Sequence, residues 1–104
     1  LTYRDGSRYD GQWLNDQRQG RGAFIWPSGN RYDGDYAKDK KTGRGVLTYR
    51  DGSRYDGQWL NDQAHGEGTL TLANGTTLKG TWTNGCFRQG GRNYKVGSGV
   101  KDCG

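Results

Sequence analysis

The chain has 104 residues, of which only 29% are hydrophobic, and its formal net charge at pH 7 is +5. This length corresponds to one domain at most, and the low apolar content combined with a net charge is typical of disordered chains. Four Trp, seven Tyr and two Phe argue against disorder, because each buried ring removes roughly 150–250 Å² from water. We therefore expect an ordered protein whose thin core is built from aromatic rings.

The first seventeen residues, Leu1 to Gln17, recur letter for letter from Leu47 to Gln63. This offset of 46 residues contains two copies of a 23-residue unit, because glycines recur at 23-residue steps. The three glycine series are Gly6, Gly29, Gly52 and Gly75; Gly11, Gly34, Gly57 and Gly80; and Gly22, Gly45, Gly68 and Gly91. A period between about 20 and 50 residues is typical of stacked repeat architectures. The sequence therefore predicts a repeat protein.

Each unit is predicted to be a β-hairpin. In the first unit, Tyr9 and Trp13 alternate with polar residues around Gly11, which places both rings on one face of a strand. A polar loop follows, and the return strand is predicted from Gly20 to Trp26. Asp-Gly and Asn-Gly pairs accept the positive φ of tight turns. The turns that join the units are predicted at Pro27–Asn30, Asp51–Gly52 and Asn74–Gly75.

The predicted fold class is all-β: a single elongated, twisted antiparallel sheet of stacked β-hairpins, about 40 Å long at roughly 4.8 Å per strand. No 3.6-residue apolar stripe occurs, so no substantial helix is expected. The repeat array is predicted over residues 1–85 and a capping segment over residues 86–104. The predicted core residues are Tyr9, Trp13, Phe24, Trp26, Tyr32, Tyr36, Leu47, Tyr49, Tyr55, Trp59, Leu70, Leu72, Leu78 and Trp82.

The motif Y-x-G-x-W, six residues, then G-x-G, repeated every 23 residues, resembles the MORN repeat family. Tyr9–Gly22 and Tyr55–Gly68 match at every marked position, whereas the second unit has Tyr36 in place of Trp. The fourth unit departs most, with Leu78 for Tyr and Gln89 for the first Gly of the pair. The resemblance covers residues 1 to about 91 and implies four repeats plus a C-terminal cap. It also implies an elongated sheet of hairpins that serves as a scaffold, a dimerisation surface or a lipid- or protein-binding module. Such repeats are often attached to an enzyme, such as a lipid kinase, a lysine methyltransferase or a caspase-like protease.

Two cysteines, Cys86 and Cys103, enclose the atypical end of the chain and are the only ones in it. They predict a structural disulfide, which would close a loop of about 18 residues and stabilise the fold by roughly 3 kcal/mol. Such a disulfide would place the protein in an extracytoplasmic compartment, periplasmic or secreted. Two reduced thiols in a cytoplasmic protein are the alternative. The chain begins with Leu1, so we expect a processed product or a fragment, and no apolar run is long enough to span a membrane.

No catalytic, cofactor or metal site is predicted. Asp10, Asp33 and Asp56 recur at one repeat position, so they share one environment, whereas an acid–base pair needs two different ones. His65 is the only histidine and stands in a hairpin loop, and Ser98 lacks the G-x-S-x-G elbow of a nucleophile.

Two surfaces are candidate binding sites. Basic residues in or near the hairpin loops could line one edge of the sheet and attract anionic lipid at about 1 kcal/mol per residue, or nucleic acid or an acidic protein. The third loop, Asn61–His65, interrupts this row, and a solvated face that keeps the sheet soluble is the alternative. The candidate anion-binding residues are Arg18, Arg21, Lys38, Lys40, Lys41, Arg44, Arg88 and Arg92. The candidate aromatic binding face consists of Tyr9, Trp13, Tyr32, Tyr36, Tyr55, Trp59 and Trp82.

The predicted function is that of a non-catalytic scaffold or interaction module, which binds a protein or a second copy of itself as a homodimer. The first alternative is a module that targets anionic membranes containing phosphoinositide or phosphatidate. The second alternative is the accessory C-terminal part of an enzyme. No nucleic-acid partner and no transmembrane segment are expected.

Overall fold

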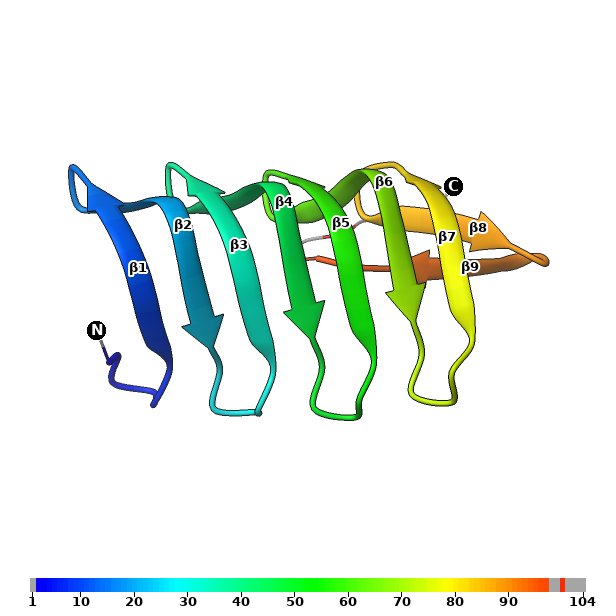
Figure 1. Ribbon diagram of the computed structural model, residues 1–104, viewed down its shortest axis with the longest axis horizontal. Coiled ribbons are helices and arrows are strands. Elements are labelled where there is room, and N and C mark those ends of the chain that lie inside the picture. Colours follow the sequence, from blue (N-terminus) through cyan, green and yellow to red (C-terminus); the bar gives the residue numbers. More distant parts are fainter. Residues whose placement is uncertain (1, 98–99, 101–104) are drawn as a thin grey trace.

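A computed structural model of the chain describes residues 2–97 and residue 100 (Figure 1). Within these residues the protein is all-β, and seven strands form one antiparallel sheet in chain order. These strands are β1 (Arg8–Leu14), β2 (Gln17–Ile25), β3 (Arg31–Ala37), β4 (Lys40–Thr48), β5 (Arg54–Leu60), β6 (Gln63–Thr71) and β7 (Thr77–Trp82). The molecule measures 42 × 24 × 20 Å. The predicted fold class, an elongated antiparallel sheet of consecutive hairpins, is confirmed.

The turns inside the repeats are tighter than predicted. Each hairpin turns on two residues that both have positive φ, such as Lys38 (50°) and Asp39 (67°). This is the conformation of a type I′ turn, whose twist matches that of the flanking strands. The return strand β2 therefore begins at Gln17 and not at the predicted Gly20. The turns that join the repeats lie where they were predicted, and Gly29, with a φ of 98°, is typical of them.

The Tyr and Gly positions of the motif form one packing unit. In the second repeat, Gly34 of β3 lies opposite Gly45 of the neighbouring strand β4, and the Tyr32 ring lies against both glycines. A methyl group at Gly45 would approach the Tyr32 ring carbons to 2.5 Å, so only glycine fits there. A register shift after Gly34 turns the carbonyl of Asp35 toward the ring, and the Tyr32 hydroxyl donates a 2.9 Å hydrogen bond to it. The same arrangement recurs in the flanking repeats at Tyr9 and Tyr55.

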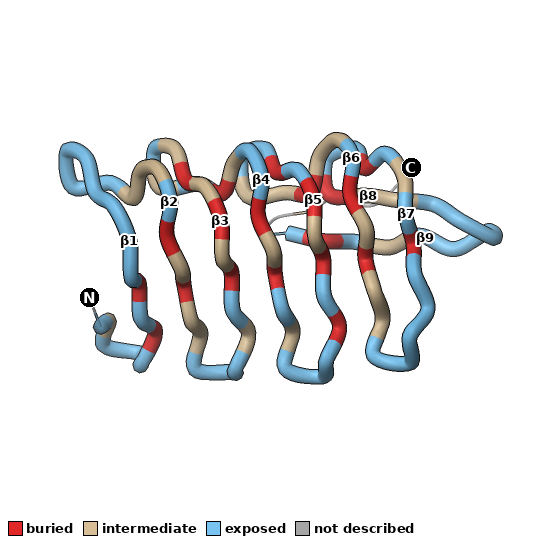
Figure 2. The backbone as a smooth tube through the Cα atoms, in the orientation of Figure 1, coloured by how far each residue is buried: buried red, intermediate tan, exposed pale blue. Residues whose placement is uncertain are grey.

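The core is a ladder of these rings, which meet edge to face at centroid distances of 5.1–5.5 Å. Ten of the predicted core residues are buried: Tyr9, Phe24, Tyr32, Tyr36, Leu47, Tyr55, Trp59, Leu70, Leu78 and Trp82. Three more are partly buried against them: Trp26, Tyr49 and Leu72. The prediction was wrong for Trp13, whose side chain is 43% exposed. Figure 2 shows why, because β1 forms the open side of the sheet and is exposed along most of its length.

The fourth repeat does not complete a hairpin within the sheet. After β7 the chain forms β8 (Cys86–Gln89), which pairs with β9 (Arg92–Lys95) and not with β7. This small hairpin lies behind the C-terminal strands in Figure 1. Its Phe87 stacks on Trp82 and fills the space beside Gly80 that a repeat tyrosine fills elsewhere. The chain forms this separate two-stranded hairpin in place of a fourth hairpin within the sheet, and we call residues 86–97 the cap.

Two predicted features concern residues that are not described. Cys103 lies outside the described residues, so the Cys86–Cys103 disulfide stays a prediction. Ser98 lies outside them as well.

Candidate functional site

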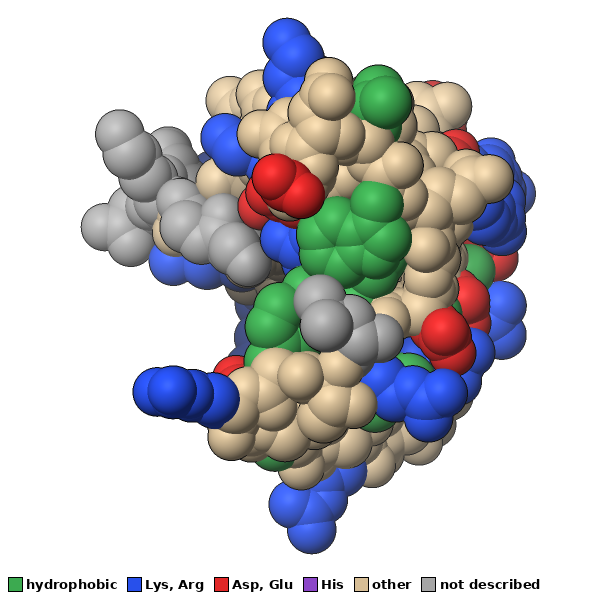
Figure 3. Space-filling view, turned by 90° about the vertical axis from the view of Figure 1, so that its left-hand side faces the viewer, with side chains coloured by type: hydrophobic (Ala, Val, Ile, Leu, Met, Phe, Trp, Pro, Cys, Tyr) green, Lys and Arg blue, Asp and Glu red, His purple; other side chains and the backbone are tan. Residues whose placement is uncertain are grey.

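The sheet is curled, and the repeat rings line its hollow side. Figure 3 looks along the long axis and shows a C-shaped outline with hydrophobic and basic side chains toward the hollow. Under the cap, Tyr49, Leu72, Tyr94 and Val96 help to line a cavity of about 260 Å³. Among the described residues, the repeat rings above this cavity pack edge to face against one another, so most of the hollow is filled by the core.

Two basic side chains point into this hollow and bind carboxylates of the next repeat. The backbone N–H of Arg18 donates to Asp39 Oδ1 at 2.7 Å, and the guanidinium Nε lies 3.1 Å from the same oxygen. Twenty-three residues later, the backbone N–H of Lys41 donates to Asp62 Oδ1 at 2.7 Å, and Lys41 Nζ lies 3.6 Å from that oxygen. Each Asp also donates a hydrogen bond from its own backbone N–H to the carbonyl of the basic residue, at 3.1 Å in both repeats. The Asp of each hairpin turn therefore clamps the preceding return strand.

Both basic groups also lie over aromatic rings. Lys41 Nζ is 5.4 Å from the Trp26 centroid and 5.6 Å from that of Trp59, which is within the range of cation–π attraction. The side chain of Lys41 is only 8% exposed, and this burial lowers its pKa, while the Asp62 carboxylate acts in the opposite direction. The hydrogen bond from the backbone N–H of Arg18 lowers the pKa of Asp39, and the Arg18 side chain adds to that effect.

The third repeat has no charged residue at the position of Arg18 and Lys41. Ala64 stands where the first two repeats have Arg and Lys, and Val96 of the cap packs there, almost fully buried. The backbone closes the gap, because Ala64 N–H donates to the Val96 carbonyl at 3.1 Å and Val96 N–H donates to the Gly85 carbonyl at 2.9 Å. The capping segment therefore replaces the cation of this repeat with an apolar side chain.

At the β1 end of the sheet, Trp13 and the turn residue Asp16 have no partner strand beside them among the described residues. Trp13 and Trp59 occupy identical seventeen-residue stretches, yet Trp13 is 43% exposed and Trp59 is 3% exposed. Trp59 Nε1 donates a 3.1 Å hydrogen bond to the Gly45 carbonyl of the preceding strand, whereas the indole of Trp13 has no such acceptor among the described residues. Asp16, the counterpart of Asp39 and Asp62, likewise makes no ion pair with them. We call the edge from Asp10 to Asp16 the N-terminal edge.

Among the predicted aromatic site residues, the structure therefore exposes one. Six of the seven rings are packed into the core and offer little surface to a ligand: Tyr9, Tyr32, Tyr36, Tyr55, Trp59 and Trp82. Trp13 alone is open to solvent, and it lies at the N-terminal edge.

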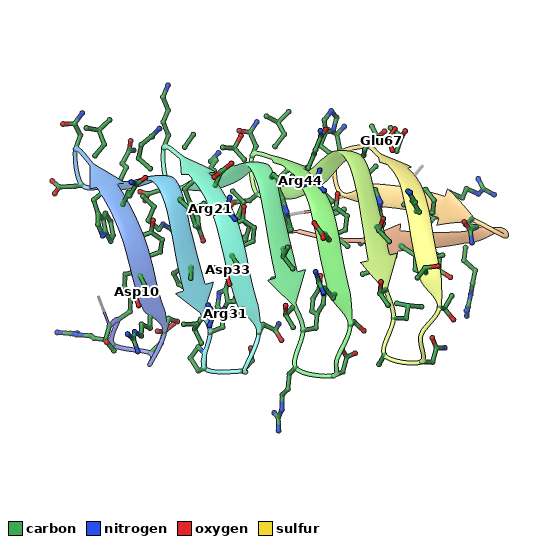
Figure 4. All side chains as sticks on the ribbon, viewed as in Figure 1. Asp10, Arg21, Arg31, Asp33, Arg44 and Glu67 are labelled. Atoms are coloured by element: carbon green, nitrogen blue, oxygen red, sulfur yellow. The ribbon has the colours of Figure 1, made fainter. Side chains whose placement is uncertain are left out.

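The predicted anion-binding residues fall in three places and not in one row. Two lie in the hollow within the carboxylate clamps: Arg18 and Lys41. Two lie on the outer face of the sheet within 3.9 Å of an aspartate: Arg21 and Arg44 (Figure 4). Four are exposed near the β3–β4 or β8–β9 turn: Lys38, Lys40, Arg88 and Arg92. The inward direction of Arg18 could have been found from the sequence, because it shares the strand parity of Gly22 and Phe24.

The recurring aspartates also have structural partners. On the outer face, Asp33 Oδ2 lies 2.8 Å from Arg31 Nε, and Asp10 Oδ2 lies 3.1 Å from Arg8 (Figure 4). His65 Nδ1 accepts the backbone N–H of Asn84 at 3.1 Å. The residues that the structure describes hold no group of three or more side chains suited to a metal ion.

Comparison with known proteins agrees with this geometry. The model of the MORN repeat matches residues 9–31, 32–54 and 55–77. The chain belongs to the MORN repeat family. Its MORN repeats coincide with the three complete hairpins and their connecting turns, and the match ends where the sheet begins its last strand. A search among curated proteins found no match. Within the described residues, no helix is long and apolar enough to cross a membrane.

Proposed function

We propose that this chain is a stiff, non-catalytic scaffold that presents a rigid surface to a protein partner. The observation that carries the proposal is the clamp between a hairpin turn and the preceding return strand, in which Asp39 holds Arg18 and Asp62 holds Lys41. A surface that is rigid before binding loses little conformational entropy when a partner binds.

The rest of the molecule fits the role of a scaffold. Among the described residues, each repeat is fixed to the next by paired glycines and ring contacts, and the first two junctions are also closed by a hairpin-turn clamp. Stability in such stacks is close to a sum of nearest-neighbour terms. The molecule, which is 42 Å long, therefore holds its two ends at a fixed separation.

Backbone ¹⁵N relaxation tests this function. We expect uniformly high order parameters for the amides of β1 to β7, across the turns that join the repeats as well as within the strands. Low order parameters confined to one of these joins would reveal a hinge, and the proposed role as a stiff scaffold would be wrong.

Membrane association is the second candidate, and one observation favours it. Leu14 and Leu60 are exposed at the turn edge of the sheet, by 58% and 47%, and Lys38 and Lys40 lie in and directly after the turn between them. Apolar tips beside cations suit the interface of an anionic bilayer. Flotation with phosphatidylserine vesicles at about 0.05 M and about 0.5 M salt tests this candidate, because membrane binding through these lysines is lost at high salt. Lys38→Glu/Lys40→Glu should abolish flotation and leave the fold intact by circular dichroism.

A further inference from the structure

We infer that the cavity between the sheet and the cap is an anchor pocket for one arginine side chain of a protein partner. The residues that line it include two tyrosines, an aspartate and aliphatic side chains. Aromatic faces attract a guanidinium group, and a carboxylate pairs with it. The inference rests on the proposed function and names the group of the partner that the rigid surface receives.

The cavity exists because the cap closes one stretch of the hollow side of the sheet. The turn that joins β4 to β5 supplies Tyr49 and Asp51, and Leu72 follows directly after β6. Tyr94 of β9 and Val96 directly after it supply the part of the lining that belongs to the cap. Tyr49, Leu72 and Tyr94 are only partly buried, so each keeps surface that a ligand can cover.

The volume of the cavity limits the size of its occupant. At about 260 Å³ it lies below the range of roughly 300–1,000 Å³ that is typical of pockets for drug-sized ligands. It therefore suits a single side chain. Arginine is one of the residues that most often anchor protein interfaces in such pockets, and its apolar stem can pack against Leu72 and Val96 while its charged head stays near the opening.

Asp51 supplies the charge that selects a cation. Its Oδ1 accepts the backbone N–H of Ser53 at 2.8 Å, and this hydrogen bond lowers the pKa of Asp51, so the group is ionised at pH 7. The carboxylate lies near the Tyr49 hydroxyl, because it adds to the larger effect of burial that raises the pKa of Tyr49. Lys95 also lines the cavity, but side chains alternate along a strand, so the side chains of Lys95 and Tyr94 lie on opposite faces of β9.

The chain already holds two cations in this way within the same hollow. The Arg18 guanidinium lies 4.9 Å from the Tyr36 centroid, and its Nε is 3.1 Å from Asp39 Oδ1. In the second repeat, Lys41 has partners of the same two kinds. Ala64 leaves the third repeat without such a cation. Rings and a carboxylate are therefore present under the cap, and a cation from another molecule can complete the set.

The first repeat contains the same turn without the cavity. Asp5 Oδ1 accepts the backbone N–H of Ser7 at 2.8 Å, as Asp51 does from Ser53, and both turns belong to the identical seventeen-residue stretches. The cap lies at the far end of the sheet from the N-terminal turn (Figure 1). Asp5 is therefore the matched control for effects of the turn that are not effects of the cavity.

Titration of the methyl-labelled protein with two blocked tripeptides, followed by NMR, tests the inference. One is acetyl-Gly-Arg-Gly-amide, and the other has citrulline, an uncharged isostere of arginine, in the middle. We expect the arginine peptide to shift the methyl signals of Leu72 and Val96 in a saturable way and to bind about five- to twentyfold more tightly than the citrulline peptide. Because the chain has a net charge of +5, long-range attraction does not favour the arginine peptide, so a preference for it arises in the pocket.

Two variants separate the charge of the pocket from its volume. Asp51→Asn keeps an acceptor for the Ser53 N–H and removes the charge, so the two peptides should bind it equally. Asp5→Asn should bind both peptides as the wild type does. Leu72→Trp fills the cavity with the residue that Trp26 provides two repeats earlier, and it should abolish the methyl shifts although Asp51 is unchanged. Circular dichroism checks that all three variants fold.

Four results would each overturn the inference: no saturable shift with the arginine peptide, equal affinity of the wild type for both peptides, the same loss in Asp51→Asn and Asp5→Asn, or shifts that persist in Leu72→Trp. None of them bears on the stiffness of the stack. The order parameters of β1 to β7 test the proposed function separately, so a failure of the pocket and a failure of the scaffold are distinguishable.

Discussion

The Lys41–Asp62 clamp predicts an asymmetry between its two partners. Lys41 is 8% exposed and Asp62 is 28% exposed, with 3.6 Å between Nζ and Oδ1. At an effective dielectric constant of about 20, two unit charges at this distance attract by about 5 kcal/mol before desolvation is subtracted. Breaking a buried pair costs roughly 3–5 kcal/mol because one charge is left without a partner. Since Asp62 is partly exposed, we expect Asp62→Asn to cost about 2–3 kcal/mol of unfolding free energy.

Lys41→Met is the matched variant, and it should be close to neutral or stabilising by about 1 kcal/mol. It removes the desolvation cost of the charge and leaves an apolar stem among rings, as Ala64 and Val96 do in the third repeat. Urea unfolding followed by circular dichroism at pH 7 measures both variants. A loss for Lys41→Met equal to that for Asp62→Asn would show that the ion pair is a net source of stability and would refute this reasoning.

The pH dependence supplies an independent check on the clamp. Burial lowers the pKa of Lys41 in the folded protein below that of the unfolded chain, so the folded state binds this proton less well. The resulting destabilisation is present below the folded pKa and is relieved as pH rises toward about 10.4. Asp62→Asn removes the carboxylate that opposes this shift, so its deficit should shrink between about pH 7 and about pH 9.5. A deficit that stays constant over this range would assign the loss to something other than the charge of Lys41.

Three further predictions concern the rings. Tyr36→Phe should be neutral or stabilising, because its buried hydroxyl has no hydrogen-bond partner among the described residues. Tyr32→Phe should cost about 1 kcal/mol by losing its bond to the Asp35 carbonyl, and equal costs for the two variants in urea unfolding would contradict this. Gly45→Ala should lower the unfolding free energy by about 3 kcal/mol or more, because its methyl group displaces the Tyr32 ring, and an unchanged melting temperature would disprove the packing unit. Burial raises the pKa of Tyr55 to about 12, so its contribution is intact below about pH 10 and is lost at about 1.4 kcal/mol per pH unit above it. Urea midpoints that stay flat from pH 10 to pH 12 would contradict that prediction.

The fold was predictable because its determinants are local and repeated. Gly11 and Gly22 recur at fixed steps, and each removes a side chain that would collide with the Tyr9 ring. Turn pairs such as Asn74–Gly75 mark the joins between repeats. Because the period is 23 residues, every unit packs against the same kind of neighbour. The structure predicted for one hairpin therefore applies to the other repeats.

The candidate site was harder to predict because it depends on which strands lie next to a residue and not on the local sequence. Trp13 and Trp59 stand in identical stretches, so no property of those seventeen residues separates the exposed ring from the buried one. Lys41 was predicted in an anion-binding row because it is a basic residue next to a hairpin loop, although its side chain lies over the Trp26 ring. Val96 could not be assigned, because it fills the place of a missing cation only after the cap folds back.

The most direct test of the central claim is hydrogen exchange at the indole N–H groups of the unmodified protein, resolved by NMR. We expect strong protection for Trp59 and Trp82, which donate to the carbonyls of Gly45 and Gly68, and rapid exchange for Trp13. Protection of Trp13 equal to that of Trp59 in dilute protein would contradict the account, because the N-terminal edge would then already be covered.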